Sequence, residues 1–304
     1  MAPNVVLVTG IADPLGRRLA ASLAANPRIE RVLGVDTIRP AGAELGRVEF
    51  VETDIRSPRI GRLLASARVD TVVHADVRAK AKEHNVIGTM QLLAGCQRAP
   101  DVRKLVVRST AEVYGAGPTS PAVFTEQDMP DNRPAAGDGR DATEVESLAR
   151  GFARRRPDVS LTIVRLAELS GRGVDTSLSR YLAMPVVPTV LGFDARVQLL
   201  HLDDAVAVLD RATTHDLPGV FNVGGDGVLL LSQAIRRAGR FPLPLPRAAI
   251  PAAARLRRVD VSPEQTRFLN YGRVLDTTRL KTTFGFTPKW STADAFDDYV
   301  RGQA

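Results

Sequence analysis

The chain has 304 residues and a formal net charge of +7, and 44% of its residues are hydrophobic and 25% charged. This composition excludes a disordered chain, a collagen-like repeat and a disulfide scaffold, and the length allows one large domain or two smaller ones. The single cysteine, Cys96, excludes an internal disulfide and zinc sites that need several cysteines, and we expect it in the core. No apolar run is long enough to cross a bilayer and the amino-terminal residues do not resemble a secretory signal, so we expect a cytoplasmic protein without a transmembrane segment.

The first half of the chain alternates short apolar runs with longer amphipathic stretches. The apolar runs predict strands over Val5–Val8, Arg31–Val35, Val48–Glu52, Thr71–Ala75, Lys104–Arg108 and Leu161–Leu166. The amphipathic stretches predict helices over Pro14–Asn26, Ser57–Ala67, Glu83–Arg98 and Asp141–Arg155. Strands separated by helices imply right-handed crossovers, so we expect an α/β fold with a doubly wound, Rossmann-type parallel sheet.

The pattern after Gly171 is less regular. It still predicts a helix, a strand and a helix over Asp203–Thr213, Val220–Val223 and Ser232–Ala238. The segment Phe241–Ala254 is rich in proline and alanine, and we expect it to be a surface connector. We therefore expect a dinucleotide-binding domain and a smaller carboxy-terminal α/β substrate lobe, over residues 1–175 (with further core elements from about 195–225) and mainly 176–304.

A glycine-rich turn follows the first predicted strand. Gly10 and Gly16 occupy the first and third positions of a dinucleotide fingerprint, and Asp13 stands where the second glycine is usual. Asp13 followed by Pro14 is a favourable helix start. The Asp13 carboxylate would compete with a phosphate for the backbone N–H groups, and at about 4 Å the repulsion would be roughly 4 kcal/mol. A capped helix that binds no ligand is an equally good interpretation.

Acidic residues end the next two predicted strands. Asp36 lies about 20 residues after the glycine turn, where a carboxylate binds the adenosine ribose and disfavours a 2′-phosphate. Asp54 and Ile55 follow the third strand, where an adenine edge could lie. Each aspartate could equally cap its own loop.

These segments and later ones resemble the extended short-chain dehydrogenase/reductase family, the NAD-dependent epimerase/dehydratases, in an actinobacterial-type form. The resemblance covers most of the chain and rests on the order and spacing of its segments. They are Val8–Gly16, Gly34–Asp36, Asp54-Ile55, Val73–Ala75, Asn85–Thr89, Ser109–Gly115, Val164–Ala167, Leu200–Ala205, Phe221–Gly225 and Phe284–Pro288. The resemblance implies a nicotinamide cofactor, a nucleotide-sugar-like or alcohol substrate, and Thr110 as the Ser/Thr that orients the substrate oxygen.

The family's acid/base pair is missing. The resemblance places its tyrosine at Asp138 and its lysine at Ala142, and no Tyr-x-x-x-Lys occurs anywhere in the chain. Glu168 and Arg172 replace the Asn and Pro that usually close over the nicotinamide. Asp138 and Glu168 are thus pocket candidates, although the glycines on both sides of Asp138 favour an exposed loop.

Three functions remain open. The first is a pseudoenzyme that acts by binding, for which we expect weak or absent NAD binding and still less NADP. The second is altered, non-redox chemistry in a pocket lined by Thr110, Asp138, Glu168 and Arg172. The third is an active NAD-dependent epimerase, dehydratase or reductase that uses unusual acid/base residues.

The remaining side chains do not predict another kind of site. The histidines have no metal-ligand spacing, so we expect no metal, and His74 at a strand end is expected to be structural. The chain has no strong nucleic-acid signal; the segment Ala248–Arg258 could touch an acidic membrane, although a solvated connector is the simpler interpretation. By resemblance we expect a homodimer that pairs through the helices Glu83–Arg98 and Asp141–Arg155, with a small-molecule or nucleotide ligand.

Overall fold

The computed structural model describes residues 3–40, 45–77, 81–128, 137–255 and 261–303. The chain forms two compact units, each with its own hydrophobic core. Unit 1 comprises Met1–Ser109, Arg140–Arg165 and Ala205–Phe221. Unit 2 comprises Thr110–Gly139, Leu166–Asp204 and Asn222–Ala304.

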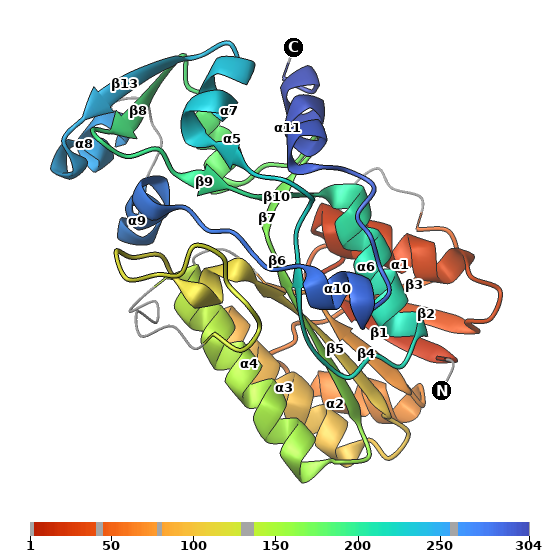
Figure 1. Cartoon of the computed structure of the whole chain (residues 1–304). Helices are drawn as coiled ribbons and strands as arrows, with labels where there is room; N and C mark the ends of the chain where they lie inside the picture. The colour runs from red at the N-terminus through yellow and green to blue at the C-terminus, as the bar shows by residue number, and fades with distance from the viewer. Residues whose placement is uncertain (1–2, 41–44, 78–80, 129–136, 256–260, 304) are drawn as a thin grey trace. The chain divides into compact units, whose positions relative to one another are not determined.

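Unit 1 is built on a seven-stranded sheet with the strand order β11-β6-β5-β4-β1-β2-β3 (Figure 1). Its strands are β1 (Val5–Thr9), β2 (Arg31–Asp36), β3 (Val48–Glu52), β4 (Thr71–His74), β5 (Lys104–Thr110), β6 (Ser160–Leu166) and β11 (Gly219–Val223). The ladders that join β1 to β2, β1 to β4, β2 to β3 and β4 to β5 are all parallel. Every residue of β1 and β4 is buried, as expected for central strands covered on both faces.

Helices cover both faces of this sheet, with α1 and α6 on one face and α2, α3 and α4 on the other (Figure 1). They are α1 (Pro14–Ala25), α2 (Arg59–Ser66), α3 (Lys82–Arg98), α4 (Asp138–Arg155) and α6 (Leu202–Thr214). Helix α1 buries Leu15, Leu19 and Leu23, a spacing of four that places all three on one side. Helices α2 and α3 pack closely, because a Cβ atom on Gly95 would lie 2.9 Å from the Cα atom of Gly61.

Unit 2 contains three two-stranded sheets, which pair β10 with β7, β12 with β9, and β13 with β8. The strands are β7 (Glu168–Ser170), β8 (Val186–Val190), β9 (Arg196–Val197), β10 (Leu199–His201), β12 (Leu229–Leu230) and β13 (Phe241–Leu245). The α-helices are α5 (Ser177–Leu182), α7 (Leu231–Arg237), α8 (Ile250–Arg255), α9 (Pro263–Tyr271), α10 (Thr278–Thr282) and α11 (Thr292–Arg301). Two short 3-10 helices are η1 (Ala111–Tyr114) and η2 (Arg247–Ala249).

The predicted fold class is confirmed, and the predicted elements of unit 1 lie within a few residues of the observed ones. The prediction of a connector over Phe241–Ala254 is wrong. This segment forms β13, η2 and the start of α8, and β13 pairs in parallel with β8. Among the described residues, no helix is both long and apolar enough to cross a membrane.

Candidate functional site

The glycine-rich turn of unit 1 has the backbone geometry that its sequence predicts. Gly10 has φ +77°, and a Cβ atom there would lie 2.7 Å from the Cα atom of Asp76. A Cβ atom on Gly16 would lie 2.2 Å from the Gly10 carbonyl oxygen. Both glycines are therefore required, the first by the turn and the second by the close approach of α1.

Two carboxylates accept hydrogen bonds from backbone amides in this turn and in the start of α1. Asp13 caps α1, and its Oδ1 accepts a hydrogen bond from the Leu15 amide at 2.9 Å. Asp36 is buried, and its Oδ2 accepts from the Ala12 amide at 2.9 Å while its Oδ1 accepts from the Thr37 amide at 2.7 Å. The amino end of α1, which attracts anions, thus already holds carboxylate oxygens supplied by the chain.

The aspartate after β3 forms its own local turn. Asp54 Oδ1 accepts from the Arg56 amide at 2.8 Å, and the Arg56 guanidinium lies 2.6 Å from Asp54 Oδ2. The hydrogen bond from Arg56 lowers the pKa of Asp54. Ile55 is buried, and it fills the space beside α3 that a side chain on Gly88 would need. Loop capping therefore accounts for Asp54, while its neighbour Ile55 belongs to the core.

A buried polar network lies at the carboxyl ends of β1 and β4. His74 Nδ1 is 3.0 Å from Thr9 Oγ1, and its Nε2 is 2.8 Å from Thr89 Oγ1. Burial lowers the pKa of His74 to about 4, so its ring is neutral near pH 7. Next to it, His84 Nε2 and Asp76 Oδ2 are 2.7 Å apart. The prediction that His74 is a satisfied structural histidine is confirmed.

Helix α4 is anchored in unit 1 by the buried carboxylate of Glu146. This carboxylate accepts from Ser109 Oγ at 2.6 Å, from Arg165 at 2.8 and 2.9 Å, and from Arg150 at 2.9 Å. Burial alone would raise the pKa of Glu146, but the hydrogen bond and charge of Arg165, with Ser109 and Arg150, outweigh burial and lower it. The anchor joins β5, α4 and β6 and so fixes the helix on which Asp138 lies.

The expectation of an exposed loop at Asp138 is wrong. Asp138 is the first residue of α4 and is partly buried. The turn comes one residue earlier, where Gly137 has φ +77°. Ala142, four residues after Asp138 and thus on the same side of the helix, is buried. The two positions that the resemblance assigns to tyrosine and lysine therefore hold a helical aspartate and a core alanine.

Unit 2 brings together several charged side chains around Glu112, which follows β5 in η1. Thr110 Oγ1 caps η1 by accepting from the Glu112 amide at 3.3 Å. Arg273 Nε donates to the carbonyl of Gly115 at 3.1 Å, which brings its guanidinium to the end of η1. Burial raises the pKa of Glu112 to about 7; Arg273 opposes this rise, and the charges of Glu168, Asp138 and Glu264 add to it.

Of the predicted pocket residues, Thr110, Asp138 and Glu168 therefore lie near Glu112. Arg172 is engaged elsewhere. Its amide donates to Asp298 Oδ2 at 2.8 Å, and its exposed guanidinium extends toward the same carboxylate. Sequence reasoning missed Glu112, although it is an acidic residue between two apolar ones and lies two positions after the end of β5. It also missed Arg273, for which the sequence carries no local signal.

Tyrosine hydroxyls in unit 2 have structural partners. Tyr114 donates to Asn222 Oδ1 at 2.7 Å, Tyr299 donates to the Ser179 carbonyl at 2.7 Å, and Tyr181 donates to the Pro188 carbonyl. Burial raises the pKa of both Tyr181 and Tyr299. The fourth tyrosine, Tyr271, packs edge-on against Phe193.

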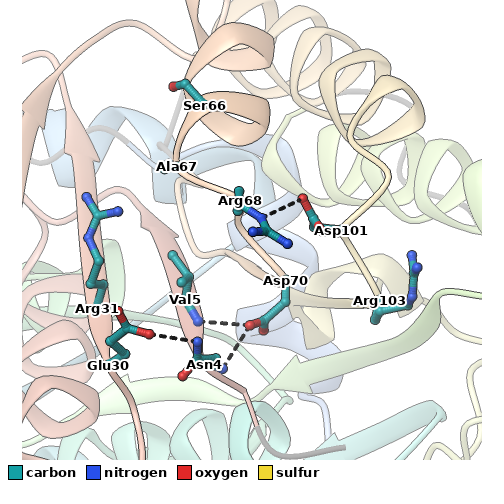
Figure 2. A pocket seen from close by; sticks show the side chains of 10 residues that line it. All are labelled: Asn4, Val5, Glu30, Arg31, Ser66, Ala67, Arg68, Asp70, Asp101 and Arg103. Carbon is teal, nitrogen blue, oxygen red and sulfur yellow. Dashed lines mark hydrogen bonds and ion pairs between the residues drawn. The ribbon is translucent and has the colours of Figure 1, made fainter.

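A cavity of about 640 Å³ lies in unit 1 at the amino ends of the parallel strands β1, β2, β4 and β5 (Figure 2). Its charged groups bind parts of the chain itself. Asp70 Oδ2 accepts from the amides of Asn4 and Val5, both at 2.8 Å, and Arg68 lies 3.6 Å from Asp101. Ligands of open parallel sheets bind at the carboxyl ends of the strands, so we assign this hollow a structural role. The described part of the chain contains no cluster of three side chains suited to a metal ion.

Comparisons with known proteins agree with this architecture. Residues 6–224 match the model of the NAD dependent epimerase/dehydratase family. The uncharacterized protein Rv0501 of Mycobacterium tuberculosis is 49% identical over 318 aligned residues, which cover 99% of this chain and 84% of the relative.

Solved structures show the same fold at low identity. The UDP-glucose 4-epimerase of Thermotoga maritima with UDP-glucose is 20% identical, with a TM-score of 0.74 and coverage of 98% of both chains. The UDP-glucuronic acid 4-epimerase of Bacillus cereus with UDP-glucuronic acid and NAD is 19% identical, with a TM-score of 0.75 and coverage of 98% of both chains. The family model and the fold together show that the chain belongs to the NAD-dependent epimerase/dehydratase family.

Proposed function

We propose that this chain has lost the tyrosine-dependent hydride transfer of its family and acts by binding a nucleotide-type or similarly polar small molecule. The observation that carries the proposal is the pair of side chains on α4. Asp138 has a carboxylate on a short side chain where the family has a phenol, and the buried Ala142 has no charge to hold a ribose or lower a pKa. The hydroxyls of Tyr114, Tyr181 and Tyr299 support the same conclusion because they hydrogen-bond to structural acceptors.

The nucleotide edge of unit 1 supports weak binding of a dinucleotide. A pyrophosphate would have to displace or lie beside the carboxylates that occupy the Leu15 and Ala12 amides. Buried Asp36 would further disfavour the 2′-phosphate of NADP. We therefore propose that NAD binds poorly at this turn, and NADP still more poorly.

The test is calorimetric titration of the whole chain with NAD, NADH and NADP, with the Asp13→Gly variant alongside. We expect no binding of NAD in the micromolar range by the wild type and a gain of at least tenfold in the variant. The same protein is then incubated with NAD and either UDP-glucose or UDP-glucuronic acid, the ligands of the two epimerases named above. Absence of epimer and of absorbance at the NADH wavelength supports the proposal. Turnover by the wild type would overturn it and favour an active NAD-dependent enzyme with unusual acid/base residues.

A second candidate function is non-redox proton transfer by Glu112. A carboxyl group with a pKa of about 7 is half protonated at neutral pH and can both donate and accept a proton. Thr110, at the start of the same 3-10 helix, offers a hydroxyl beside it. A probe is UDP-glucuronic acid in heavy water, because the hydrogen on the carbon next to its carboxylate is replaced by deuterium only when a base removes it. Deuterium uptake by the wild type that disappears in Glu112→Gln, but persists in Glu264→Gln, supports this function; no uptake by the wild type excludes it for this ligand.

We also propose a homodimer that pairs through α3 and α4. Ile87 and Met90 are exposed apolar residues three positions apart on α3, so they lie on one face of the helix. Light scattering should give twice the mass of one chain at micromolar concentration, and Met90→Glu should shift it toward one chain. A wild-type monomer under the same conditions would remove this proposal.

A further inference from the structure

The positive charge of the chain is concentrated in one segment. Residues 227–259 contain seven arginines and no acidic residue, and seven is also the net charge of the whole chain. The remaining residues therefore carry equal numbers of positive and negative charges. Five of these arginines, Arg236, Arg237, Arg240, Arg247 and Arg255, belong to the described part of unit 2. An excess of charge confined to one segment creates a local field that attracts anionic partners.

The same segment exposes large apolar side chains. Strand β13 pairs with β8 from Phe241 opposite Val186 to Leu245 opposite Val190, and we call these two strands the β8–β13 ribbon (Figure 1). Exposed fractions on the ribbon are 74% for Phe241 and 43% for Leu243, and those in the turn that follows β8 are 64% for Leu191 and 46% for Phe193. Among the large hydrophobic residues that the structure describes, Phe241 is the most exposed.

The outer edge of β13 is not suited to pairing with another strand. The amide of Phe241 donates to the Pro185 carbonyl, and the carbonyl of Leu245 accepts from Leu191, so the backbone of residues 241, 243 and 245 faces β8. Residues 242 and 244 then face outward, and both are prolines without an N–H group. An added peptide strand would find no donors there, which disfavours a partner that binds by strand addition.

The arginines around the ribbon keep most of their charge available. Arg237 pairs with Asp297 at 2.9 Å. By contrast, Arg236, Arg247 and Arg255 are exposed and make no ion pair with the described residues. Arg247 begins η2, two positions after the end of β13, and Arg255 ends α8, which packs against β8. Exposed cations therefore accompany the exposed apolar side chains of the ribbon.

We propose that the β8–β13 ribbon is a docking surface for an anionic lipid bilayer. Phe241 and Leu243 enter the interfacial region, and the arginines, Arg247 and Arg255 among them, contact lipid phosphates. Apolar side chains flanked by arginines match the two layers of such a surface, acyl chains below and negative headgroups above. The contact is peripheral, needs no spanning helix, and is independent of the proposed function.

A bilayer fits these observations better than a nucleic acid or a folded protein. Nucleic acids are bound by several aromatic rings that stack on successive bases, whereas the ribbon itself exposes one aromatic ring, Phe241, beside the aliphatic Leu243. A strand-pairing protein needs the donors that Pro242 and Pro244 remove. A lipid surface requires neither a groove nor a fixed hydrogen-bond pattern.

The experiment is co-sedimentation of the whole chain with vesicles. One set is pure phosphatidylcholine, and the other contains about one third phosphatidylglycerol. We expect binding only to the anionic vesicles, and its loss when the salt concentration is raised toward 1 M, because salt screens exposed charges. Arg247→Gln with Arg255→Gln should weaken partitioning roughly 20- to 30-fold, since each arginine near such a surface contributes about fivefold. Phe241→Ser should weaken it roughly tenfold.

Matched variants in unit 1 provide the controls. Arg28→Gln with Arg62→Gln removes the same charge from exposed positions, and Ile38→Ser removes a similarly exposed apolar side chain. Both controls should bind anionic vesicles as the wild type does. Equal loss in the control and test variants would overturn the proposal by showing that only total charge matters. Absence of wild-type binding to anionic vesicles, or binding of a DNA duplex in preference to vesicles, would also overturn it.

Discussion

The guanidinium of Arg165 holds the carboxylate of Glu146 at two points, with an Nε–Oε1 distance of 2.9 Å and an Nη2–Oε2 distance of 2.8 Å. Both side chains are almost fully buried. A pair of this kind specifies one arrangement of the surrounding elements, because either charge alone would be strongly destabilising in the interior. In this chain the pair fixes α4 against β6 although the helix lacks the tyrosine and lysine of its family.

Replacing Arg165 should therefore destabilise the folded chain. Arg165→Met leaves Glu146 buried without its main partner, and we expect a loss of about 3–5 kcal/mol in the free energy of unfolding. Urea denaturation measures this loss. Arg31→Met is the control, because Arg31 and Glu49 form an exposed pair that contributes about 0–1 kcal/mol. Equal losses in the two variants would contradict the assigned role.

The same pair should make stability depend on pH on the acid side. The pKa of Glu146 is lower in the folded chain than its ordinary value, so the ionised carboxylate stabilises the fold above that ordinary value. This stabilisation is lost as the pH falls through the lowered pKa. Glu146→Gln should lose less stability than the wild type between pH 5 and pH 3. If the free energies of unfolding of the two proteins fell by the same amount over this range, the stabilising role of the ionised Glu146 would be contradicted.

Two substitutions of Asp13, the residue that caps α1, should differ in their effect on stability. Asp13→Ala removes the hydrogen bond to the Leu15 amide and is expected to cost about 1 kcal/mol, whereas Asp13→Gly costs only a few tenths. Thermal unfolding of both variants measures the difference. A small loss in Asp13→Gly also ensures that any gained affinity for NAD reflects the ligand site and not a loosened helix.

The titration of the Glu112 carboxyl group should be directly measurable. Carbon-13 spectra of the glutamate carboxyl groups should show one that titrates near pH 7, and Glu112→Gln should remove that signal. Arg273→Gln should move the titration to higher pH, since the charge of Arg273 opposes the effect of burial. Because the folded pKa is raised above the ordinary value of 4.5, this group stabilises the fold at low pH and the contribution declines as the pH rises toward about 7. A Glu112 signal that titrates near 4.5 would contradict the arrangement.

Two glycines with similar backbone angles should respond differently to alanine. Gly10 has φ +77° and Gly46 has φ +56°, so both substitutions carry the cost of a left-handed conformation, about 1–2 kcal/mol. Only at position 10 would the new Cβ atom collide with Asp76, whereas nothing lies within 4 Å at position 46. Gly10→Ala should therefore destabilise the chain by about 1–3 kcal/mol more than Gly46→Ala in urea denaturation. Similar losses would mean that the turn can relax away from Asp76.

Unit 1 could be predicted well from the sequence because its elements follow simple periodicities. Its central strands are apolar throughout, its helices are amphipathic, and Asp13 with Pro14 marks the start of α1. The partners of the acidic side chains were harder to predict, because they are particular backbone amides whose positions depend on the fold. Asp36 lies at the predicted strand end, but the residue type alone does not predict that its carboxylate accepts from the Ala12 and Thr37 amides.

Unit 2 was predicted less well because its strands are short and pair with distant partners. The prolines of β13 suggested a connector, yet both occupy outward positions of an edge strand, where no N–H is needed. Glu112 could not be identified by its residue type, since its raised pKa depends on burial and on charges from segments up to 161 residues away in the sequence, such as Arg273. The position of Asp138 depended on one glycine, because the turn at Gly137 allows α4 to begin at the next residue.

The assembly of unit 1 from three separated segments has a consequence for its biosynthesis. Strand β5 ends at Thr110, but its neighbour β6 begins only at Ser160, and the edge strand β11 begins at Gly219. At roughly 5–20 residues per second, a nascent chain that has completed β5 waits on the order of ten seconds for β11. During that time the sheet has an unfinished, apolar edge. A ribosome-bound chain that stops before residue 219 should therefore engage chaperones, and release from them should coincide with emergence of β11.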